Sequence, residues 1–220
     1  MSKIINLQNM KLFLTSNGLE NKDVSNHFEM SLLPREPKDI SLLVISIQDS
    51  EQDAFYLDKT LTEIKNTGAI NIDVFKLGNE KFTTDKEYDV VFVCGGNTFD
   101  YLDRVRKTGL DKFIVDFTKK ENSVYVGVSA GSILAGPDIA IAGDEDSNDI
   151  GLTDLRGLCL TDFIVYPHYR KELKTQLDEF KKRNGYPIIE LEDNQAVILN
   201  YSNIGNLKGV LSMSYINKDL

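Results

Sequence analysis

The chain has 220 residues, a charged fraction of 27% and a formal net charge of −9 at pH 7. A negative net charge repels phosphate backbones and argues against a nucleic-acid-binding protein. No apolar run approaches the ~18 residues of a membrane span, and Met1–Met10 lacks the basic-then-apolar order of a signal peptide. Neither Cys94 nor Cys159 has a Cys or His at metal-ligand spacing, which favours free thiols. We therefore expect a cytoplasmic protein without membrane or nucleic-acid partners.

Short apolar runs alternate with amphipathic stretches along the chain. Continuous apolar runs are typical of strands covered on both faces, and spacings of three and four indicate helices. In chain order these are the runs Leu12–Leu14 and Leu42–Ile47, a helical pattern at Ala54, Leu57, Leu61 and Ile64 that Gly68 ends, the run Val90–Cys94, a helical pattern at Leu102, Val105, Phe113 and Phe117 broken at Thr108-Gly109, the run Val124–Val128, a helical pattern at Leu173, Leu177 and Phe180, and the run Ala196–Leu199. This alternation predicts an α/β fold with a mostly parallel sheet. Such sheets bind ligands at the carboxyl ends of their strands.

The pattern changes near the C-terminus. Three segments, Pro187–Leu191, Gln195–Asn200 and Leu207–Tyr215, have the character of strands joined by short polar turns. We expect them to form an antiparallel extension of the sheet.

The sharpest motif is Gly127-Val128-Ser129-Ala130-Gly131, which fits the G-x-S-x-G turn between a strand and a helix. A serine at such a turn is held above the strand end in a strained backbone conformation, which flanking glycines permit. The N–H of Ala130 then points to where an oxyanion would form. The alternative is a tight strand–helix connection in which the small residues only serve packing.

A serine nucleophile needs a base, usually histidine. His27 lies in an amphipathic stretch, Asn26–Glu29, that is typical of a surface helix. His168 lies just after the strand-like segment Asp162–Tyr166, where a base is expected. A structural histidine in a turn is the alternative, but the serine motif favours His168 as the base.

Several carboxylates could orient the histidine. Glu192 and Asp193 follow a predicted strand, and Asp144, Glu145 and Asp146 form an acidic cluster after the serine motif. The residues by themselves do not rank these acids.

A second glycine-rich turn, Cys94-Gly95-Gly96-Asn97-Thr98, follows the run Val90–Val93. Its N–H groups at a helix start favour negative charge, so it could supply a second oxyanion donor. A phosphate-binding loop is a rival interpretation, although the P-loop Lys-Ser/Thr is missing. A simple capped turn is the third alternative. Cys94 lies in the predicted strand and is expected to be a core residue.

Three segments are together similar, in order and spacing, to the peptidase E (aspartyl dipeptidase) family of serine peptidases, of which cyanophycinase is a larger relative. They are Gly95–Phe99, Gly127–Ser132 and Pro167–Tyr169, and the resemblance covers about Leu12 to Asn200. It implies a three-layer α/β/α sandwich related to class I glutamine amidotransferases, as a single domain over residues 1–220. The chain resembles the short uncharacterised branch of the family more than the characterised dipeptidase.

The resemblance also implies roles for individual residues. Ser129 matches the nucleophile and His168 the base, while Gly96 and Ala130 match the oxyanion-hole positions. The segment Leu191–Asn194 is similar to the one whose Glu completes a Ser-His-Glu triad.

Glu192 is therefore the first choice for the triad acid and Asp193 the reserve. Asp144 falls where the family has a further Asp implicated in activity. The family's Gly-Glu-Thr-Arg segment, whose Arg is expected to bind an acidic side chain, has no match here. Arg170 and Lys171 are cations that could replace it.

We expect a Ser-His-Glu/Asp triad that hydrolyses short peptides through an acyl-enzyme, with an N-terminal Asp preference implied by the resemblance. The expected partner is a small peptide, a homodimer is left open, and we expect no metal or organic cofactor. The alternatives are an esterase or amidase with the same residues, and a non-catalytic binding or stress protein on this fold.

Overall fold

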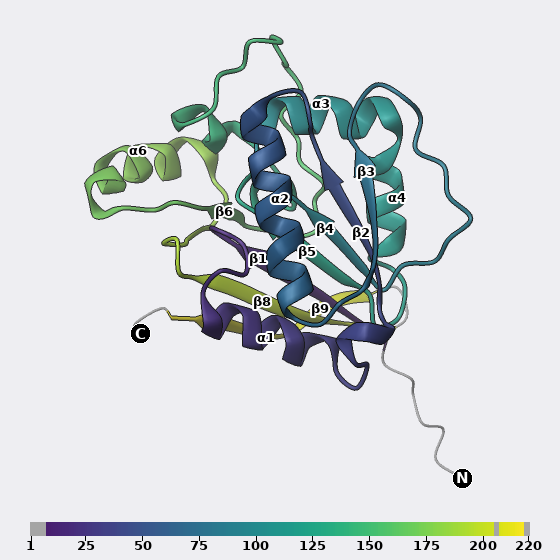
Figure 1. Cartoon of the computed structure of the whole chain (residues 1–220). Coiled ribbons are helices and arrows are strands. Elements are labelled where there is room, and N and C mark those ends of the chain that lie inside the picture. Colours follow the sequence, from purple (N-terminus) through teal and green to yellow (C-terminus); the bar gives the residue numbers. More distant parts are fainter. Residues whose placement is uncertain (1–7, 205–206, 218–220) are drawn as a thin grey trace.

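The computed structural model describes residues 8–204 and 207–217. Seven strands form one sheet in the order β3-β2-β4-β5-β1-β8-β9, and helices cover both of its faces (Figure 1). The strands are β1 (Gln8–Thr15), β2 (Ser41–Ser46), β3 (Asn71–Lys76), β4 (Val90–Val93), β5 (Val124–Val128), β8 (Ala196–Ile204) and β9 (Leu207–Ile216). The predicted three-layer α/β/α arrangement is confirmed.

The helices in the described residues are α1 (Lys22–Leu32), α2 (Glu51–Asn66), α3 (Thr98–Thr108), α4 (Leu110–Phe117), α5 (Ala130–Leu134) and α6 (Lys174–Asn184), with short 3₁₀ turns at Pro37–Asp39, Ala140–Asp144 and Lys171–Leu173. Four of them, α2, α3, α4 and α6, follow the predicted periodic segments. Gly109 separates α3 from α4 because its φ of 84° lies in the left-handed region that ends a helix. Within residues 8–204 and 207–217, the structure contains no helix with the length and apolar character that crossing a membrane requires.

Strand directions agree with the predicted mostly parallel sheet. β3, β2, β4, β5 and β1 pair in parallel, while β8 and β9 extend the sheet in antiparallel pairing. One part of the predicted extension is wrong. The segment Pro187–Leu191 contains β7 (Ile188–Glu190), which pairs in parallel with β6 (Ile164–Tyr166) in a separate two-stranded sheet.

Alternate residues of the central strands enter two different hydrophobic clusters. In β2, Leu43 and Ile45 pack with α3, α4 and α5, whereas Leu42 and Val44 pack with α1 and α2. Since side chains alternate across a strand, a fully apolar run supplies both layers at once. In Figure 1, α1 and α2 lie on the same side of the sheet. The sheet is thus packed on both faces, and this leaves the carboxyl ends of its strands as the place for a site.

Candidate active site

Ser129 lies at the carboxyl end of β5 and is the single residue that joins this strand to α5. Its φ of 49° and ψ of −109° are unusual for a non-glycine residue. Such a conformation costs roughly 1–3 kcal/mol and persists where the surroundings hold it. Here the Ser129 N–H donates to the carbonyl of Thr15 at 3.1 Å, which ties the turn to β1. The strain predicted from the motif is present at the serine itself.

The two motif glycines are needed for space. A methyl group on Gly127 would lie 2.5 Å from the Gly131 oxygen, and one on Gly131 would lie 2.4 Å from the Val93 oxygen. These distances are shorter than any tolerated contact, so strand β5, strand β4 and helix α5 approach too closely for a side chain. The glycines therefore allow the backbone packing that holds Ser129, in addition to easing its turn.

Gly131→Ala is expected to destabilise the protein by about 1–3 kcal/mol, the usual cost of forcing extra atoms into a packed core. Urea unfolding measures this change. Gly78→Ala is the matched control, because a methyl group on Gly78 meets nothing within 4 Å. Equal stability of the two variants would show that the close approach at Gly131 relaxes without cost.

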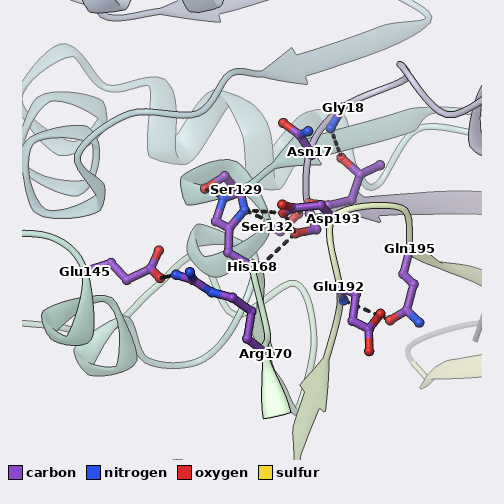
Figure 2. Close-up of polar contacts among 12 residues, drawn as sticks. Asn17, Gly18, Ser129, Ser132, Glu145, His168, Arg170, Glu192, Asp193 and Gln195 are labelled. Carbon is purple, nitrogen blue, oxygen red and sulfur yellow. Dashed lines mark hydrogen bonds and ion pairs between the residues drawn. The ribbon is translucent and has the colours of Figure 1, made fainter. Parts of the chain in front are cut away.

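His168 contacts Ser129 directly. Its Nε2 lies 2.9 Å from Ser129 Oγ, although the two residues are 39 positions apart in sequence (Figure 2). His168 also has a positive φ, of 55°. It follows β6, so it comes from the small two-stranded sheet and not from a strand of the main sheet. His27, by contrast, lies on α1 with its Nδ1 2.7 Å from the Asp23 carbonyl.

The carboxylate beside the imidazole belongs to Asp193, the reserve choice, and not to Glu192. Asp193 Oδ1 lies 2.6 Å from His168 Nδ1. The Glu192 side chain points away from the imidazole in Figure 2, and its backbone N–H donates to the Gln195 side-chain oxygen at 2.9 Å. This correction has a simple origin: consecutive residues of a turn point in different directions, and sequence similarity does not show which one faces the histidine.

Ser16 is a site residue that the sequence reasoning missed. Its hydroxyl accepts the His168 backbone N–H at 2.7 Å, donates to Asp193 Oδ1 at 3.2 Å, and lies 3.5 Å from His168 Nδ1. It directly follows β1 and is fully buried. Ser16 thus braces both the imidazole and its carboxylate. Its position at the end of a predicted strand was the one feature of the sequence that could have indicated a site residue, but no motif includes it.

Asp144 does not contact the serine or the histidine. Its Oδ2 accepts a hydrogen bond from the Tyr166 hydroxyl at 3.3 Å, and Tyr166 ends β6, two residues before His168. Burial, followed by the charge of Asp144, raises the pKa of Tyr166 well above its usual value. Asp144 therefore contacts the strand that precedes His168, and it does not contact His168 itself.

The predicted oxyanion-hole residues lie around Ser129. Ala130 begins α5, so its N–H has no partner within that helix. Across the turn, a methyl group on Gly95 would lie 3.4 Å from Ser129 Cβ. Gly96 has a φ of 147°, which only glycine adopts readily, and it lines the same cavity as Ser129. The loop that the sequence singled out thus packs against the serine.

Cys94 is buried, as predicted, and burial raises the pKa of its thiol to about 12. A thiol in this state does not provide a thiolate nucleophile at neutral pH. Within the described ranges of the chain, no group of three His, Cys, Asp or Glu side chains is arranged to hold a metal ion.

A cavity of about 690 Å³ opens beside Ser129 and His168. Besides Ser129 and His168, its wall includes residues 16–18 after β1, residues between 47 and 63 that include much of α2, the turn Gly95–Asn97 with two residues of α3, and residues 145–147. This volume is in the range of small-ligand sites. A small ligand bound in this cavity would lie beside Ser129.

The model of peptidase family S51 matches residues 12–206. The chain belongs to peptidase family S51. Among curated relatives, an uncharacterized peptidase of Listeria monocytogenes is 29% identical over 163 residues, which cover 72% of this chain and 77% of the relative. An uncharacterized peptidase of Pasteurella multocida is 28% identical and covers 86% of this chain and 93% of its own length. Peptidase E of Salmonella typhi is 31% identical over 54% of this chain and 50% of the relative.

Solved structures agree with this family membership. A Listeria monocytogenes protein provisionally described as peptidase E is similar with a TM-score of 0.71 and 25% identity, covering 93% of this chain and 100% of that one. A peptidase from an acI-B1 actinobacterium shares the fold with a TM-score of 0.65 at 13% identity, covering 93% of this chain and 95% of the other. The protein is a peptidase of the peptidase E type.

Proposed function

We propose that this peptidase is a serine enzyme that hydrolyses short peptides through Ser129, His168 and Asp193. The observation that carries the proposal is the 2.9 Å contact between His168 Nε2 and Ser129 Oγ, with Asp193 on the other ring nitrogen at 2.6 Å. This chain of contacts has the order of a Ser-His-acid triad, in which each group prepares the next.

The reaction follows from these positions. Asp193 accepts a hydrogen bond from the Nδ1–H of His168, which leaves Nε2 free to take the hydroxyl proton of Ser129 as Oγ bonds to the peptide carbonyl carbon. The carbonyl oxygen becomes an oxyanion that the N–H groups of Ala130 and Gly96 stabilise. Protonated His168 then gives its proton to the leaving amine as the C–N bond breaks. Water, deprotonated by His168, hydrolyses the resulting ester and releases the acid.

The backbone of the site supports this role. Ser129 and His168 are both non-glycine residues with positive φ, at 49° and 55°. Strained residues cluster where the fold holds reacting groups in place. The Ser16 hydroxyl adds a second support because it contacts both the His168 backbone and Asp193.

A fluorophosphonate probe tests whether Ser129 is an activated nucleophile. The expected result is one covalent adduct, which peptide mapping by mass spectrometry assigns to Ser129. His168→Ala should lose labelling. Ser147→Ala is the matched control and should be labelled like the wild type, since Ser147 lines the same cavity and its hydroxyl donates to Asp149.

Two results would contradict the proposal. Absence of labelling in the folded wild-type protein would favour a non-catalytic binding protein on this fold. Labelling combined with rapid hydrolysis of p-nitrophenyl esters, and no cleavage across a panel of dipeptides, would favour an esterase with the same residues.

A further inference from the structure

Most of the charged side chains that line the catalytic cavity are acidic. Two cationic side chains, Lys59 and Arg104, face six carboxylates, which are those of Asp49, Asp53, Glu63, Asp100, Glu145 and Asp146. Low-dielectric walls of one charge sign concentrate the field inside a cleft. The cavity therefore favours a ligand that brings positive charge.

Both cations are already held by acidic groups of the chain. Lys59 Nζ lies 2.9 Å from Glu20 and 3.7 Å from Glu63, and it donates to the Asn17 side chain at 3.1 Å. Arg104 lies 2.6 Å from Asp49 and donates to the Leu77 carbonyl at 3.1 Å. An acidic substrate side chain would have to displace these partners.

The cations that follow His168 in sequence do not compensate. Arg170 is turned towards Glu145, at 3.6 Å, and its side chain is 70% exposed (Figure 2). Lys171 begins an exposed 3₁₀ turn. Neither residue lines the catalytic cavity. The replacement for the missing substrate-binding arginine that the sequence suggested is therefore not found at these positions.

The Asp100 carboxylate has no direct partner among the described residues. In the described part of the chain, no hydrogen-bond donor and no ion-pair partner contacts the Asp100 carboxylate. Burial raises its pKa, Asp103 and two further acids add to the effect, and Arg104 opposes it. Glu63 has a side chain that is only 10% exposed, and its Oε1 has no hydrogen-bond partner but lies 3.7 Å from Lys59 Nζ.

Asp53 presents one oxygen to the glycine turn beside Ser129. Its Oδ2 accepts the Ser50 and Asp49 N–H groups at 3.0 and 3.1 Å as part of the cap of α2. Its Oδ1 lies 3.8 Å from where a Cβ of Gly96 would stand. The neighbouring Gly95 packs against Ser129, so this short turn joins the carboxylate to the nucleophile.

We propose that the cavity selects peptides with a basic N-terminal residue, whose positive charges are received by the carboxylates of Asp100 and Asp53. This rests on the proposed function, because the scissile carbonyl must lie at Ser129. The same carboxylates repel an acidic side chain, so the selectivity is the reverse of the Asp preference that the sequence resemblance implies.

Hydrolysis of three dipeptides, Lys-Leu, Ala-Leu and Asp-Leu, tests the selectivity. We expect kcat/KM to be at least about tenfold higher for Lys-Leu than for Ala-Leu, the effect of one favourable charge contact, and lowest for Asp-Leu. Asp100→Asn should bring the kcat/KM for Lys-Leu close to that for Ala-Leu. Asp116→Asn is the matched control, because Asp116 lies on α4 with a 72% exposed side chain and lines no part of the cavity.

Calorimetric binding of the same dipeptides to Ser129→Ala separates this inference from the proposed function. Tighter binding of Lys-Leu than of Asp-Leu supports the inference whether or not the wild type cleaves either peptide. Equal or tighter binding of Asp-Leu overturns it, even if Ser129 proves to be the nucleophile. A Lys-Leu preference that survives in Asp100→Asn would remove Asp100 from the proposal. Asp53→Asn is less informative because it also alters the capping box of α2.

Discussion

Ser129→Ala is expected to lower kcat for peptide hydrolysis by about a million-fold, the scale seen when a serine-protease nucleophile is removed. The substitution keeps the Cβ and deletes only the hydroxyl, whose hydrogen bond is to His168. The fold should therefore survive, and urea unfolding of the variant should match that of the wild type. A steady-state assay with purified variant measures the loss.

His168→Ala provides the second half of this prediction. Because every proton that His168 transfers belongs to the reaction that passes through Ser129, its removal should cost about as much as removal of the serine, and the double variant should lose little more. This strong non-additivity is the signature of residues that act as one unit. Additive losses would mean that the two side chains contribute separately, and the 2.9 Å contact would then have no mechanistic meaning.

The interior of the fold was predictable because each buried strand carries apolar residues for two layers at once. Val124–Val128 was predicted as a strand with the bounds that β5 has. β3 was not predicted, since this edge strand is half-exposed and interrupts its apolar residues with Asp73 and polar ends. Apolar runs reveal strands that are covered on both faces, and they miss strands at the edge of a sheet.

The site was predictable where a motif fixes the local backbone. The turn at Ser129 is such a case, because close packing at Gly127 and Gly131 allows no other residue type. Ser16 and Asp193 belong to the opposite case. Their roles arise when β1, the segment after β6 and the turn before β8 meet in space, with separations of 152 and 25 residues from His168. A single sequence does not show which of its distant segments come into contact in the fold.

Asp193→Asn is expected to lower kcat/KM by about a thousandfold, which is less than the roughly 10⁴-fold loss for a fully buried triad carboxylate. Asp193 Oδ1 accepts a hydrogen bond from the Nδ1–H of His168 and so keeps Nε2 unprotonated for Ser129. An asparagine amide can instead donate to Nδ1, which favours the tautomer that cannot accept the serine proton. The loss is reduced because the Asp193 side chain is 65% exposed and Ser16 also supports the imidazole.

Glu192→Gln is the matched control for this substitution. It removes the same negative charge from the adjacent residue, but the Glu192 side chain points away from the imidazole (Figure 2). We expect less than about a threefold change in kcat/KM, since an exposed charge that makes no contact has a weak, screened effect. Measuring kcat/KM of both variants across pH 5–9 separates the effect of losing the contact with His168 from the effect of losing one negative charge. If Glu192→Gln lost activity and Asp193→Asn kept it, the triad acid would be the residue that the family resemblance implied, and the turn at 192–193 would have to rearrange when substrate binds.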